Sequence, residues 1–145
     1  MVKYCVPDNS RVGVHLSAAH YLYHRAYMIR DYKHILPLVL QAMFPVRRER
    51  LTVAEMLSAY GKASYHREQD RVHLGILKLA WGEPEKLEDY IRLACEDYRD
   101  LLCAAEYPLS SLQSGLSENN PVKYKQLQEN ESAEYDAWLE NVLSA

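Results

Sequence analysis

The chain has 145 residues, of which 48% are hydrophobic and 26% are charged, and its formal net charge is −3. These values are typical of a soluble globular protein and exclude wholesale disorder. The length suits one domain, so we expect a single domain over residues 1–145. The longest apolar run, residues 35–44, is far shorter than the roughly 20 residues that span a bilayer. We therefore predict no membrane partner and a cytoplasmic location.

The charges are divided unevenly along the chain. Residues 1–82 hold 12 Lys and Arg against 6 Asp and Glu, whereas residues 83–145 hold 5 against 14. Such polarity can hold two halves of one domain together, steer an anionic partner to the basic half, or promote head-to-tail association. The acidic balance of the whole chain argues against nucleic acid as a partner.

The first half of the chain predicts three helices. Residues 14–36 form a long amphipathic pattern, which we expect to end before Pro37 because the residue before a proline avoids the helical conformation. A short helix can then start at Pro37 and end at Pro45. Thr52 and Glu55 have the spacing of a capping box, which predicts a helix over residues 50–61 that stops at Gly61.

The second half predicts helices over residues 66–82 and from Pro84 to Tyr107. The latter carries the clearest apolar stripe, with hydrophobic residues at three- and four-residue spacing: Leu87, Ile91, Ala94, Tyr98, Leu101, Leu102 and Ala105. A polar loop over residues 109–120 precedes two expected helices, one from Pro121 and one from Ser132. The fold class is therefore all-α, a helical bundle of five to seven helices.

Residues 74–94 resemble one tetratricopeptide unit at Leu74, Gly75 and Ala94. They depart from that repeat at Lys78, Leu87 and Arg99, and no second copy lies 34 residues away on either side. The resemblance implies only a central antiparallel helical hairpin over residues 66–107, with the segment WGEP as its turn.

Two histidine patterns are candidates for a metal site. His20 and His24 lie within a stripe about 80° wide on the first predicted helix, away from its apolar face. His66, Asp70 and His73 have i, i+4, i+7 spacing, which places them on one face of a helix that starts before His66. Imidazole and carboxylate ligands suit a divalent transition metal, and helical bundles build such sites from facing helices. Metal binding, with possible hydrolytic chemistry, is the alternative hypothesis.

Further candidates point to binding rather than catalysis. Arg47, Arg48 and Arg50 precede a predicted helix start, a suitable place for an anion. Tyrosine is enriched at protein interfaces, and four tyrosines surround the first predicted helix: Tyr21, Tyr23, Tyr27 and Tyr32. No nucleotide-binding loop or hydrolase elbow is present. The favoured hypothesis is a protein-interaction or regulatory module without catalysis or cofactor, which binds a protein partner or forms a homo-oligomer.

Overall fold

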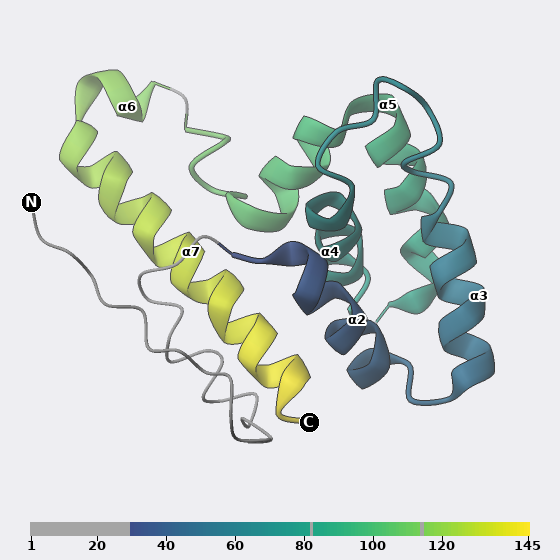
Figure 1. The fold of residues 1–145 in the computed structure, drawn as a ribbon. Helices are drawn as coiled ribbons and strands as arrows, with labels where there is room; N and C mark the ends of the chain where they lie inside the picture. The colour runs from purple at the N-terminus through teal and green to yellow at the C-terminus, as the bar shows by residue number, and fades with distance from the viewer. Residues whose placement is uncertain (1–29, 82, 114) are drawn as a thin grey trace, which may run out of the picture.

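The computed structural model describes residues 30–81, 83–113 and 115–145. Within these ranges the chain forms an all-α helical bundle (Figure 1), which confirms the predicted fold class. The elements are α2 (Tyr32–Met43), α3 (Arg47–Leu57), α4 (Gln69–Leu79), the 3-10 turn η2 (Pro84–Lys86), α5 (Leu87–Glu106), α6 (Leu116–Asn119) and α7 (Pro121–Leu143). In the described part of the chain, no helix is long and apolar enough to cross a membrane.

Helices α4 and α5 form the central hairpin of the bundle. Six consecutive α4 residues, Val72 to Leu77, are buried, because α4 is covered by other helices on nearly all sides. A Cβ atom added at Gly75 would lie 3.3 Å from the Cβ of Ala105, so the glycine allows the two helices to approach closely. Arg71 near the start of α4 pairs with Glu106 at the end of α5. The hairpin is therefore antiparallel, as the tetratricopeptide resemblance implied.

Helix α2 runs through Pro37, where a break was expected. Asp31 caps the helix by accepting a hydrogen bond from the backbone N–H of His34 at 3.3 Å. Pro37 has no backbone N–H, so the carbonyl of Lys33 lacks the hydrogen bond that it would otherwise accept within the helix. Lys33 and Pro37 are both exposed, so water can satisfy that carbonyl. Burial of Ile35 and Val39 on the opposite side holds the helix together across the proline.

Helix α3 begins at Arg47, and the predicted capping box is wrong. Thr52 lies inside the helix, where its hydroxyl donates to the carbonyl of Arg48 at 3.1 Å. The helix extends upstream because arginine and glutamate are good helix formers up to the boundary set by Pro45. Its last helical residue is Leu57, and the following turn reaches Gly61, which has a φ of 119°.

Helix α7 is one continuous helix, where two had been expected. Nothing between Gln126 and Glu134 breaks a helix, and Ser132 is tolerated inside it. All of its buried residues lie in the second half: Glu131, Tyr135, Trp138, Leu139 and Val142. The first half, residues 121–130, contacts α6 and lies at the edge of the bundle (Figure 1).

Candidate functional site

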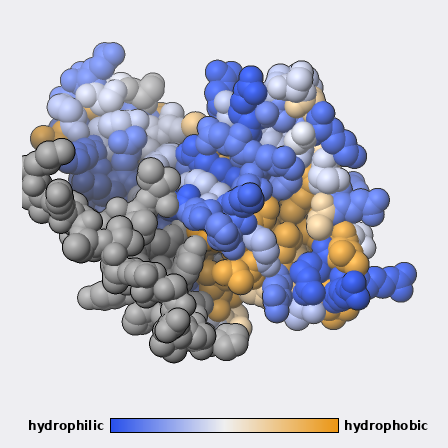
Figure 2. Space-filling model, in the orientation of Figure 1, coloured by the Kyte–Doolittle hydropathy of each residue, from blue (hydrophilic) through white to orange (hydrophobic). Residues whose placement is uncertain are grey.

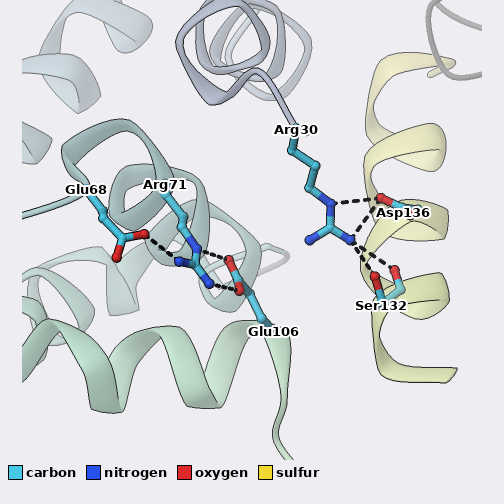
Figure 3. A network of polar contacts seen from close by, with 6 residues as sticks. All are labelled: Arg30, Glu68, Arg71, Glu106, Ser132 and Asp136. Carbon is cyan, nitrogen blue, oxygen red and sulfur yellow. Dashed lines mark hydrogen bonds and ion pairs between the residues drawn. The ribbon is translucent and has the colours of Figure 1, made fainter. Parts of the chain in front are cut away.

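A buried ion pair ties the hairpin together (Figure 3). The guanidinium of Arg71 donates from Nε to Oε1 of Glu106 at 2.8 Å and from Nη2 to Oε2 at 2.6 Å, and it also bonds Glu68. The Glu106 side chain is only 2% exposed, whereas that of Arg71 is 28% exposed. The bidentate geometry is the strongest form of a carboxylate–arginine contact.

Arg30 forms a second tie, between the start of α2 and α7 (Figure 3). It donates to Oδ1 of Asp136 at 3.2 Å and to the hydroxyl of Ser132 at 2.9 Å, and its guanidinium lies 4.5 Å from the ring centre of Tyr135. Both ties join an arginine of the basic first half to an acid of the acidic second half. Part of the charge difference between the two halves therefore forms ion pairs within the fold. Arg30 and Arg71 are already paired with carboxylates of the same chain.

His73 is buried in the core of the hairpin. Its Nε2 lies 3.0 Å from the carbonyl oxygen of Tyr60, which can only accept, so the neutral ring donates from Nε2. Burial lowers the pKa of His73. A neutral imidazole with this hydrogen bond holds α4 against the turn that follows α3 and contains Tyr60.

His66 lies in the loop before α4, because that helix begins at Gln69. Its ring stacks on Tyr60 with centroids 4.2 Å apart and meets Tyr65 edge-on at 4.8 Å. Nδ1 accepts a hydrogen bond from the backbone N–H of Gly61 at 2.7 Å. The neutral ring therefore carries its proton on Nε2, which is buried and has no partner within the described residues.

Within the described residues, the predicted metal ligands do not come together in one cluster. His20 and His24 lie outside the described residues. Of the second pattern, His66 is in the loop and His73 is bonded to Tyr60, and no set of three His, Cys, Asp or Glu among residues 30–81, 83–113 and 115–145 could hold a metal ion. With its proton on Nε2, His66 offers a donor rather than the lone pair that a metal requires. The metal site stays a prediction.

The three arginines of the predicted anion site have different roles. Arg50 donates to the carbonyl of Phe44 at 2.9 Å and so satisfies a carbonyl at the end of α2. Arg47 and Arg48 are exposed, and neither forms an ion pair within the part of the chain that the structure describes. Two free cationic side chains therefore remain on the first turn of α3.

These two arginines lie one helical turn before an exposed leucine. Leu51 is 58% exposed and lies four residues after Arg47 and three after Arg48. Residues three and four apart are neighbours on a helix surface, and the exposed Ala54 and Glu55 continue the same face. We call Arg47, Arg48, Leu51, Ala54 and Glu55 the α3 face. Figure 2 shows further hydrophobic surface over α2 and between α2 and α3.

Of the four predicted interface tyrosines, the structure describes Tyr32. Tyr21, Tyr23 and Tyr27 lie outside the described residues. Tyr32 is half-buried, packs against the core, and has the Arg71 guanidinium 6.0 Å from its ring centre. Burial raises the pKa of its hydroxyl. Much of this ring is therefore engaged within the fold.

A bend in α5, which the sequence analysis did not anticipate, forms one wall of a cavity. Asp97 has φ −152° and ψ 102°, outside the helical region, and its Oδ1 accepts from the backbone N–H of Arg99 at 2.9 Å. Asp97 thus caps the second part of α5 as an N-cap residue does. The cavity, of about 330 Å³, is lined by residues 65–67 and 94–99. An aspartate within a helical pattern was the only sequence signal for this bend.

No protein family, curated protein or solved structure matches this chain.

Proposed function

We propose that this chain is a non-catalytic protein-interaction module, and that its α3 face binds an amphipathic helix of a partner protein with carboxylates beside an aliphatic stripe. The observation that carries the proposal is the exposed Leu51 next to two arginines of the preceding helical turn, neither of which forms an ion pair within the described residues. Arginine beside an apolar anchor is a frequent composition of binding hot spots.

Two further features of α3 support this role. Only Val53 and Leu57 of α3 are buried, so most of its surface remains available to another molecule. Val46, at the N-cap position, makes no side-chain hydrogen bond to the helix start. The first N–H groups of α3 and the guanidinium groups of Arg47 and Arg48 therefore favour negative charge at the same end of the helix.

The size of the effect follows from the exposed leucine. Full burial of a leucine side chain is worth about 1.5–3 kcal/mol, and 58% of Leu51 is still exposed. Covering it with a partner contributes about 1–1.5 kcal/mol, which corresponds to about tenfold in affinity. Each arginine adds a salt-dependent contribution, because both side chains are at the surface.

The test starts from an unbiased selection of helical peptides from a random library on the purified protein. Recovered peptides should combine an aliphatic stripe with Glu or Asp, and fluorescence anisotropy should show about tenfold weaker binding to Leu51→Ala and weaker binding to Arg48→Glu. Leu112→Ala and Arg92→Glu are matched controls at exposed positions outside α3.

Three results would overturn the proposal. Peptides without acidic residues, or peptides whose affinity does not change in Leu51→Ala, would remove the α3 face as the binding surface. Analytical ultracentrifugation covers the remaining occupant: a wild-type dimer that Leu51→Glu dissociates would assign the face to a second copy of the chain instead.

A further inference from the structure

The charges on the α3 face oppose the dipole of their own helix. Arg47 and Arg48 lie in the first turn of α3, where the helix dipole favours negative charge, and Glu55 lies in the last turn, where it favours positive charge. Glu49, the first-turn charge that suits the dipole, lies roughly 160° around the helix from Leu51, outside the α3 face. The stability of α3 therefore does not explain the charges on this face.

The two charged ends of the α3 face are too far apart to neutralise each other. Glu55 follows Arg47 by eight residues and Arg48 by seven, which is about 10–12 Å along the helix axis. Side chains on one helix meet when they are three or four residues apart. Glu55 is exposed and, like the two arginines, forms no ion pair within the described residues. The α3 face thus has a positive end, the apolar Leu51 at its centre and a negative end.

This order of groups selects a partner that carries both signs of charge. A helix that covered Glu55 without a cation would remove water from an unpaired carboxylate, which costs affinity. Two helices packed at a crossing angle of about 20° have nearly the same rise along their contact. Side chains four residues apart on the partner therefore match the spacing of Arg47, Leu51 and Glu55.

Resting on the function proposed above, we propose that the partner helix presents an acidic, an aliphatic and a basic residue at four-residue spacing, with the basic residue opposite Glu55. The acidic residue then meets Arg47 and Arg48, and the aliphatic residue covers Leu51. The order of the two charges fixes the direction of the partner: an acid that precedes the base in its sequence places it parallel to α3.

The first part of the test uses the helical peptides recovered by the selection that bind Leu51→Ala more weakly than the wild type. These peptides should carry Lys or Arg two helical turns from Glu or Asp, on the same side as the aliphatic stripe. Leu51-dependent peptides without this base would overturn the inference and leave the proposed function in place. Absence of Leu51-dependent peptides would overturn both.

The second part is a charge exchange measured by fluorescence anisotropy. Glu55→Lys should bind such a peptide about fivefold more weakly than the wild type, because an attraction at the surface becomes a repulsion. The same peptide with its base replaced by Glu should bind Glu55→Lys more tightly than the wild type. Glu49→Lys is the matched control, because it makes the same change of charge on α3 outside the α3 face, and its affinity for the original peptide should stay within about twofold of the wild type.

A melting curve separates recognition from folding. Lysine in the last turn suits the helix dipole, so Glu55→Lys should melt no lower than the wild type. A lower Tm would show that Glu55 supports the fold and would overturn the argument. Unchanged peptide affinity in Glu55→Lys, or equal losses in Glu55→Lys and Glu49→Lys, would overturn it as well.

Discussion

Replacing Arg71 by methionine should be among the most damaging single changes to a charged residue in this protein. The variant keeps an apolar stem but removes two hydrogen bonds, at 2.8 and 2.6 Å, from a carboxylate that is 2% exposed. Breaking a fully buried pair costs about 3–5 kcal/mol. Because the Arg71 side chain is 28% exposed, water can reach the site of the lost guanidinium. We expect the free energy of unfolding to fall by about 2–4 kcal/mol.

The assay is urea unfolding followed by circular dichroism, together with the melting temperature. A loss of about 3 kcal/mol should lower Tm by about 6–12 °C for a chain of this size. Arg92→Met is the matched control: Arg92 contacts Asp89 at 2.8 Å, but its side chain is 71% exposed, so its loss should cost less than about 1 kcal/mol. Arg71→Met combined with Glu106→Leu should recover most of the stability. Equal losses of unfolding free energy in Arg71→Met and Arg92→Met would refute the reasoning.

Three further predictions concern stability. Burial lowers the pKa of His73, so below about pH 6.5 the unfolded chain binds more protons than the folded one, and the free energy of unfolding should fall by up to about 1.4 kcal/mol per pH unit. Chemical unfolding at pH 7 and at pH 5 measures this loss, which should be smaller in His73→Gln than in the wild type. An identical loss in the two proteins would contradict the assignment. Asp97→Ala should lower Tm more than Asp97→Asn, since asparagine can still cap the second part of α5; calorimetry showing the reverse order would remove Asp97 as a cap. Gly61→Ala should lower the free energy of unfolding by about 1–2 kcal/mol, because alanine disfavours a φ of 119° and its Cβ would lie 2.5 Å from the Gln69 side chain. A urea-unfolding midpoint equal to that of the wild type would be inconsistent with backbone strain at this position.

Periodicity predicted those parts of the fold that depend on burial along one helix. The expected stripe of α5 is buried at Leu87, Ile91, Ala94, Leu101, Leu102 and Ala105. Helix ends were less predictable, because competing local signals decide them. Pro37 did not end α2 since its missing hydrogen bond faces water, and the hydroxyl of Thr52 bonds backward within α3 rather than capping it.

The candidate sites depended on contacts between distant parts of the chain. Arg71 and Glu106 are 35 residues apart, and their pairing follows from the antiparallel arrangement of α4 and α5 rather than from any local pattern. His66 was assigned to a helix by its spacing from Asp70 and His73, but Tyr60 holds its segment in a loop. The apolar stripe of α5 continues at helical spacing through Asp97, so it concealed the bend. Arg47 and Arg48 were identified from sequence as a basic group, whereas their lack of ion pairs within the described residues required the structure.

The uneven packing of α7 divides the bundle into regions that should exchange their amide protons at different rates. Residues 121–130 have no buried side chain, whereas Tyr135 and Leu139 are almost fully enclosed in the core. Amide groups in the first half can exchange with solvent when that half and α6 open locally. Amide groups around Tyr135 exchange only when the core itself unfolds. We therefore expect this single continuous helix to span two cooperative units, with the boundary between them near Glu131, the first buried residue of the helix.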